Sequence, residues 1–388
     1  MLYFILPEIN NSLDLTNIKI KRGENDIIIS KSLSNYLNDL KTQINNYKEN
    51  WDFFKKYTNT YEYIHTNIPY TKLDVCKYKP LSRAFYKLIE IYQSLNLLND
   101  TEKSINSFHL AEGPGGFIEA IEYMRKNNND KYYGMTLIDN NNDNVPGWNK
   151  GKYFLSKHKN IIIENGIDKT GNLFSIDNLW HCYHKYNNTM DLITGDGGFD
   201  FSNDFNKQEI LCINLVFCQI CYAIAIQKKG GSFVLKIFDI FSEVTIDIIY
   251  LLSLVYKEVY ITKPNTSRTA NSEKYIICKN FKIDERLNII KHLASILKDI
   301  NNNSNPIKRF LNIDIPYYYI NKIEDINAVF GQQQLENIIS TLYLLDNNKN
   351  EKIEILKKNN IQKCIQWCNK YKLPYNHTSY INNLFLPN

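Results

Sequence analysis

The stretch Phe108-His-Leu-Ala-Glu-Gly-Pro-Gly-Gly-Phe-Ile-Glu-Ala-Ile121 decides how the rest of the sequence is interpreted. Its mostly apolar start predicts a buried strand, the glycines at 113–116 predict a tight turn, and residues 117–124 predict a helix. A strand, a glycine turn and a helix in this order open nucleotide-binding α/β domains. Glycines let the backbone bend sharply and approach a ligand, and the start of a helix offers free N–H groups to a carboxylate or phosphate. The stretch contains neither a Walker A loop nor G-x-G-x-x-G. Taken alone, it is therefore also compatible with a glycine turn that has only a structural role.

The composition is that of a globular protein. The chain has 388 residues, of which 44% are hydrophobic and 22% charged, enough for one large domain with additions or for two domains. A net charge of +5 and an aromatic content of 13% suit an acidic partner such as RNA, although many proteins without such a partner look similar. The eight cysteines show no complete zinc pattern, since the pair Cys218 and Cys221 lacks a second pair. We therefore expect buried free thiols in a reducing compartment and no metal.

The longest apolar stretch, Ile210–Ile226, predicts a buried core helix more readily than a membrane span, because polar residues interrupt it. The N-terminus lacks the basic region and cleavage pattern of a signal peptide. We expect no membrane association and an intracellular location. The nucleus, the cytoplasm and, for a viral protein, the host cytoplasm all remain open.

Predicted strands and helices alternate from about residue 107 to 256, and two predicted strands then follow in succession. This order predicts a mainly parallel sheet with one antiparallel strand late in the domain. Ligands of such sheets bind outside the carboxyl ends of the strands. Glu112 and Asp196 both follow predicted strands directly, so we expect them at the ligand-binding edge.

The chain divides into three predicted parts. Residues 1–75 form an N-terminal extension of mixed structure, with one or two helices between 34 and 57. Residues 76–283 form the α/β domain, and residues 284–388 form a helical C-terminal extension in which apolar residues recur at helical spacing. Neither extension carries a visible chemical motif.

Lys236 lies inside the apolar strand Val-Leu-Lys-Ile-Phe. An unpaired buried ammonium group is costly, so this lysine must be paired or neutral. Asp196, which ends another strand among glycines, is its natural partner. Burial and a second nearby cation both lower the pKa of a lysine, and a neutral lysine can take a proton from a hydroxyl group.

Several motifs in the same order resemble the FtsJ-like family of S-adenosylmethionine-dependent RNA ribose 2′-O-methyltransferases. They are the segments 82–87, 111–117, 195–199, 230–238 and 263–279. The last segment is most similar to the cap-specific mRNA branch of the family. The resemblance covers residues 80 to 282. It implies a Rossmann-like methyltransferase fold with a mainly parallel seven-stranded sheet and one antiparallel strand, to which helical N- and C-terminal additions are joined.

The resemblance also implies a catalytic tetrad, which by motif falls on Lys87, Asp196, Lys236 and Glu273. Lys236 would be the base, or the cation that stabilises the 2′-alkoxide as it forms. Lys87 would lower the pKa of Lys236 and help to hold the ribose. Asp196 and Glu273 would orient the two lysines and balance their charge.

The cofactor implied is S-adenosylmethionine, held by Gly113, Pro114, Gly115, Gly116, Phe117, Thr136, Asn172, Leu173 and Asp196. Asn172 departs from the family, which usually has an acidic residue there beside an apolar one that contacts adenine. Lys263 and Arg268 would bind RNA, assisted by Lys87 and by Lys77 and Lys79 upstream. The implied partners are capped mRNA and other capping or transcription proteins, and the sequence leaves the oligomeric state open.

Two rival functions remain after the resemblance. One is methylation of rRNA or tRNA rather than of capped mRNA. The other is a non-catalytic subunit of an RNA-processing complex that keeps the cofactor fold without turnover. The complete tetrad favours an active enzyme.

Overall fold

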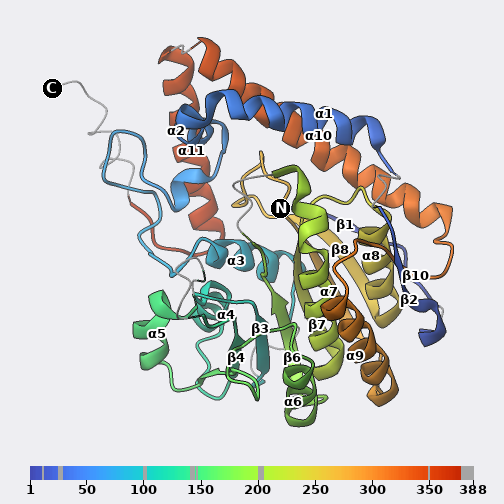
Figure 1. Cartoon of the computed structure of the whole chain (residues 1–388). Helices are drawn as coiled ribbons and strands as arrows, with labels where there is room; N and C mark the ends of the chain where they lie inside the picture. Colours follow the sequence, from blue (N-terminus) through green and yellow to red (C-terminus); the bar gives the residue numbers. More distant parts are fainter. Residues whose placement is uncertain are drawn as a thin grey trace.

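The computed structural model describes residues 1–10, 13–24, 29–98, 103–139, 145, 147–199, 205–347 and 350–376 (Figure 1). A sheet of eight strands forms the centre of this described part, in the order β1-β8-β9-β7-β6-β3-β4-β5. The strands are β1 (Leu2–Ile5), β3 (Asn106–Leu110), β4 (Lys131–Met135), β5 (Ile161–Ile163), β6 (Met190–Gly195), β7 (Gln227–Ile237), β8 (Tyr256–Lys263) and β9 (Lys274–Phe281).

The seven strands from β3 to β9 have the predicted topology. Strands β5, β4, β3, β6 and β7 pair in parallel, and β9 pairs antiparallel with both β7 and β8. The prediction of a mainly parallel sheet with one antiparallel strand is therefore confirmed for these strands. The predicted number of strands was too small, because β1 adds an eighth, antiparallel to β8. Nothing in the short apolar run at the N-terminus indicated a partner more than 250 positions away.

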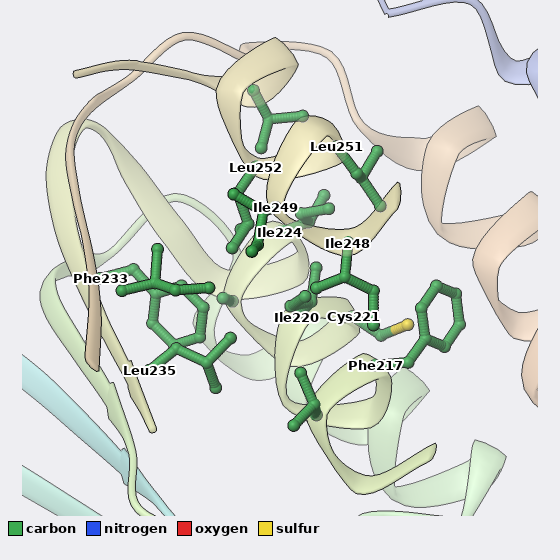
Figure 2. Close-up of a cluster of buried hydrophobic side chains, with 14 of the residues drawn as sticks. Phe217, Ile220, Cys221, Ile224, Phe233, Leu235, Ile248, Ile249, Leu251 and Leu252 are labelled. Atoms are coloured by element: carbon green, nitrogen blue, oxygen red, sulfur yellow. The ribbon is translucent and has the colours of Figure 1, made fainter. Parts of the chain in front are cut away.

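Helices cover both faces of the sheet, and the alternation of side chains along β7 separates two cores. Val234 points to the face covered by α3 (Ala84–Leu95) and α4 (Gly116–Arg125). Phe233 and Leu235 point to the opposite face, where they pack against a second set of helices. The second set comprises α6 (Ile176–Tyr186), α7 (Gln208–Ile226), α8 (Glu243–Val255) and α9 (Leu287–Asn302). Figure 2 shows the part of that core in which Phe233 and Leu235 lie beside the apolar side chains of helices α7 and α8.

Helix α7 is long and apolar enough to span a membrane by length and composition alone. However, 78% of its most apolar window is buried inside the fold, which agrees with the prediction of a core helix. The eight cysteines, three of them on this helix, are all buried and free, as expected.

The N- and C-terminal parts of the chain pack against each other as well as against the sheet (Figure 1). Strand β2 (Ile18–Arg22) pairs antiparallel with β10 (Ile307–Leu311), so the C-terminal part is not entirely helical. Helices α1 (Lys31–Gln43) and α2 (Lys48–Thr58) confirm the helices predicted between 34 and 57, and both contact α10 (Tyr317–Asn347). Helix α11 (Asn350–Lys370) packs against α2, and the short α5 (Lys152–Lys157) lies apart from these helices.

Candidate active site

A cavity of about 720 Å³ opens at the carboxyl ends of the parallel strands, where the topology predicts a ligand. Its volume falls within the range of small-molecule and cofactor sites, roughly 300–1,000 Å³. Its lining includes the four residues of the implied tetrad and six of the nine residues expected to hold the cofactor: Gly113, Pro114, Thr136, Asn172, Leu173 and Asp196.

The tetrad is assembled from four elements into two ion pairs. Lys87 on α3 places its Nζ 2.8 Å from the carboxylate of Glu273, which immediately precedes β9. Lys236 on β7 places its Nζ 3.2 Å from Oδ1 of Asp196 and donates a hydrogen bond to the Asp196 carbonyl at 2.6 Å. The fold therefore brings together the four residues that the resemblance implies, and the predicted Lys236–Asp196 pair is present.

Two neutral side chains that the sequence analysis missed complete this arrangement. Tyr275 donates its hydroxyl hydrogen to Oδ1 of Asp196 at 3.0 Å, and Ser267 donates to Oε1 of Glu273 at 2.8 Å. Both donors restrain a tetrad carboxylate. Tyr275 lies two positions after Glu273, and side chains two positions apart in a strand point to the same face. This spacing could have indicated that Tyr275 also faces the tetrad.

The pKa values of the two lysines shift in opposite directions, and the lowered one belongs to Lys87 and not, as expected, to Lys236. Burial lowers the pKa of Lys87, and the neighbouring Glu273 offsets this only in part. Burial also acts to lower the pKa of Lys236, but the charges of Asp196 and Glu273 outweigh it, so that the pKa lies above its ordinary value. The pKa of Glu273 lies well below its ordinary range, since the two lysines overcome the effect of burial. The expected lowering of the Lys236 pKa is thus wrong for the protein alone, because two carboxylates face that ammonium group.

The glycine turn shapes the cavity differently from the prediction. Gly115, Gly116 and Phe117 are not among the residues that line it. The Phe117 ring is buried in the core and packs near Tyr275. Glu112 accepts hydrogen bonds from the backbone N–H groups of Phe117 and Ile118 at 2.5 and 3.3 Å. The N–H groups of Phe117 and Ile118 are therefore taken by the chain itself and are not free for a ligand.

Other glycines are required where backbone segments approach closely around the cavity. A Cβ atom on Gly113 would lie 2.4 Å from the carbonyl oxygen of Gly147. A Cβ atom on Gly171 would lie 1.9 Å from the Thr136 carbonyl oxygen, and Gly171 has φ of +64°. Both distances are shorter than any side-chain atom tolerates, so this wall of the cavity needs glycine.

Asn172 and Leu173 line the same wall. Leu173 is buried, and the Asn172 side-chain oxygen accepts a hydrogen bond from the Phe174 N–H at 3.0 Å. Asn172 thus shapes its own turn, as Asx residues commonly do, while its side chain still borders the cavity.

The two residues expected to bind RNA have partners within the protein. Lys263 is 8% exposed, and its ammonium donates to the carbonyls of Asn271 and Glu273 and to the Asn271 side chain, at 2.6–2.9 Å. Its three donors hold the ends of the 263–273 loop together, which leaves none for a phosphate. Arg268 forms a two-pronged salt bridge with the buried Glu62, at 2.6–3.2 Å. Its side chain remains 28% exposed, so an RNA contact by Arg268 stays a prediction.

Of the upstream lysines, Lys79 is exposed and forms a salt bridge with Asp74, and Lys77 is exposed. Their role in attracting RNA also stays a prediction. Within the described part of the chain, no group of three or more His, Cys, Asp or Glu side chains is placed to hold a metal ion.

Taken together, the open α/β sheet, the glycine-shaped cavity at its carboxyl edge and the paired lysines and carboxylates form a candidate ligand-binding and catalytic site. The model of the FtsJ-like methyltransferase family matches residues 80–281, more than half of the chain. The chain belongs to the FtsJ-like methyltransferase family, which confirms the resemblance, the methyltransferase class and S-adenosylmethionine as the cofactor.

Similar curated proteins come from the cap-specific branch. The cap-specific mRNA (nucleoside-2′-O-)-methyltransferase 1 of Dictyostelium discoideum is 37% identical over 209 residues, which are 49% of this chain and 27% of that protein. The corresponding methyltransferase 2 of Drosophila melanogaster is 28% identical over 286 residues, 68% of this chain and 39% of that protein. That of Danio rerio is 27% identical over 341 residues, 81% of this chain and 43% of that protein. The chain thus spans less than half the length of each of these relatives.

Proposed function

We propose that this protein transfers the methyl group of S-adenosylmethionine to a ribose 2′-hydroxyl of RNA, near the 5′ cap of mRNA. The observation that carries the proposal is the pair of lysine–carboxylate contacts at one cavity of a family member: Lys87 with Glu273, and Lys236 with Asp196. The relatives named for cap-specific mRNA methylation support the RNA and the cap as substrate.

The residues present fit the cofactor. Gly113 and Gly171 allow the backbone segments of this cavity wall to pack closely together, and the apolar side chain of Leu173 on the same wall offers a flat ring a contact surface. When bound, S-adenosylmethionine supplies a methyl group already activated by its sulfonium charge. The chain therefore has to supply position and charge balance, which can account for a large part of a rate enhancement.

The chain's own residues would act as follows. Lys236, whose pKa is raised by Asp196 and Glu273, carries a positive charge at neutral pH and suits the stabilisation of a forming 2′-alkoxide. Of the two roles considered from the sequence, the charged one is thus favoured over a neutral base, and the 2′-hydroxyl proton then leaves to solvent water. Lys87, held by Glu273, borders the same space and would hold the ribose. Asp196 and Glu273 keep both ammonium groups in place.

The test is methyl transfer from labelled S-adenosylmethionine to capped RNA, followed by digestion of the product to nucleosides. The expected product is a 2′-O-methylated nucleotide next to the cap. A matched capped RNA with 2′-deoxyribose in its first positions is the control and should accept no methyl group there. Label on a base, or equal label on both RNAs, would contradict the proposal.

The two rivals give different results in the same assay. Equal methylation of capped and uncapped transcripts of one sequence would favour an rRNA or tRNA methyltransferase. Binding of the cofactor in calorimetry, with no transfer to any RNA, would favour a non-catalytic subunit of an RNA-processing complex.

A further inference from the structure

Glu90 is a buried carboxylate on α3 that has no part in the proposed reaction. It is 0% exposed, yet three N–H groups donate to it. They are the backbone N–H groups of Asn265 at 2.7 Å and Thr266 at 3.1 Å, and the indole Nε1–H of Trp367 at 2.5 Å. Burial raises the pKa of Glu90 to about 7, and the three hydrogen bonds act in the opposite direction by stabilising the ionised form of this buried group.

On one side, these contacts lead to the tetrad. Thr266 is held at both ends of its backbone, because Glu90 accepts from its N–H and the Arg83 guanidinium donates to its carbonyl at 3.1 Å. The next residue, Ser267, donates to Glu273 at 2.8 Å. Glu273 is in turn the partner of Lys87, which lies one helical turn before Glu90 on α3. Helix α3 thus holds Lys87 directly and its partner Glu273 through the loop.

On the other side, the contacts lead to α11. Trp367 is buried and meets the ring of Tyr86 edge to face, with the ring centroids 5.8 Å apart. Helix α11 lies outside the residues 80–281 that match the family, and Figure 1 shows its C-terminal end reaching α3. Trp367, a residue of the C-terminal extension, therefore donates to the same carboxyl group of Glu90 that holds the 263–273 loop.

We propose that Glu90 is a positioning residue that couples α11 to the tetrad, an inference that rests on the proposed function. Glu90 and Trp367 fix the start of the 263–273 loop so that Ser267 keeps the Glu273 carboxylate on Lys87. Loss of this restraint displaces Glu273 and leaves the cofactor wall of Gly113 and Gly171 unchanged. The effect falls on the rate of transfer and not on cofactor binding.

The experiment compares three variants of the full chain. Glu90→Gln keeps the shape but removes one acceptor oxygen, and Trp367→Phe keeps a ring but removes the N–H donor. Ser94→Ala is the matched control, because Ser94 also joins α3 to the C-terminal extension, at 3.4 Å from the hydroxyl of Tyr371, which directly follows α11. For each variant, kcat, the KM for capped RNA, the Kd for S-adenosylmethionine and the melting temperature are measured.

Glu90→Gln is expected to lower kcat by about 10- to 100-fold, the scale for misplacing a reacting group by roughly 1 Å. Trp367→Phe should lower it less, and the cofactor Kd should stay within about twofold in both. Unchanged kcat in Glu90→Gln, or a loss matched by Ser94→Ala, would overturn the inference. So would a parallel loss of cofactor binding.

Hydrogen exchange of the loop gives a readout that does not depend on activity. The amides of Asn265 and Thr266 should exchange faster in Glu90→Gln and in Trp367→Phe than in the wild type or in Ser94→Ala. If Glu90→Gln does not fold, Trp367→Phe alone decides. Wild-type protein inactive on every RNA would defeat the proposed function, whereas unchanged exchange would defeat the role of Glu90.

Discussion

The two walls of the cavity are built in different ways. On the tetrad wall, four charged side chains from four elements form two ion pairs, with Tyr275 and Ser267 as added donors. On the cofactor wall, the decisive feature is the lack of side chains, because Gly113 and Gly171 have no room for a Cβ atom. One wall therefore supplies charge and the other supplies shape. Substitutions on the two walls should separate the rate of transfer from the affinity for the cofactor.

The largest expected effect is on the tetrad wall. Lys236→Ala should lower methyl transfer by at least ~100-fold, the usual scale for a positioned catalytic group. Its cofactor Kd should change little, because the glycine wall is intact. Single-turnover transfer and calorimetry measure the two quantities. Lys228→Ala is the control, since Lys228 lies at the far end of the same strand and pairs with Asp191. Full activity of Lys236→Ala would remove this lysine from the site.

On the cofactor wall, a substitution is expected to have a smaller effect, and to change the affinity for the cofactor instead of the rate of transfer. Gly113→Ala should weaken S-adenosylmethionine binding by about 10-fold or more, because its Cβ atom would displace the Gly147 carbonyl. At saturating cofactor the variant should keep most of its kcat. The control is Gly230→Ala, which has φ of +78° but nothing within 4 Å of its Cβ atom, and so should lose stability alone. A loss of kcat without a change in Kd would show that the two walls are not separable.

The salt bridge between Arg268 and Glu62 provides a test that depends on pH. Burial would raise the pKa of Glu62, but Arg268 and its other cationic neighbours lower it from 4.5 to about 2. A carboxyl whose pKa is lower in the folded state stabilises the fold above its unfolded pKa. That stability is lost as the pH falls from about 4.5 towards about 2, and a shift of this size corresponds to about 3 kcal/mol.

Arg268→Gln should therefore lower the free energy of unfolding clearly at pH 7 and much less near pH 4, where the unpaired Glu62 takes up a proton. Urea unfolding at the two pH values measures this. Lys229→Gln is the control, because its salt bridge with Asp284 is exposed and should contribute little. Equal destabilisation at both pH values would mean that Glu62 does not depend on Arg268 for its charge.

The smallest effect is expected at Asn172, on the cofactor wall. Asn172→Asp should tighten S-adenosylmethionine binding by about 3- to 5-fold, because a hydrogen bond to a charged acceptor is stronger by roughly 1 kcal/mol. Asn172→Ala should weaken binding by a similar factor, with kcat unchanged in both. Calorimetry of the two variants measures this. No difference between them would mean that Asn172 serves only its own turn, through the Phe174 N–H.

Local patterns in the sequence were enough to predict the parts of the site that depend on one element at a time. The glycine turn after β3 and the alternation of strands and helices predicted the sheet and its ligand-binding edge. A lysine inside an apolar strand required a partner, and Asp196 is that partner. The resemblance then supplied Lys87 and Glu273, whose spacing alone gave no reason to join them.

Only the tertiary structure decided how these groups are used, because burial and charge at a site are sums over residues distant in the chain. The sequence predicts that Lys263 is a loop cation available to RNA. In the fold it is buried, and its ammonium group donates three hydrogen bonds to Asn271 and Glu273. Lys236, and not Lys87, has the raised pKa, because two carboxylates from separate elements face it. Glu90 carries no signal in its own helix, and its contact with Trp367 joins positions 277 residues apart. The sequence by itself determined which side chains reach the edge of the sheet, and their protonation and partners were settled by long-range packing.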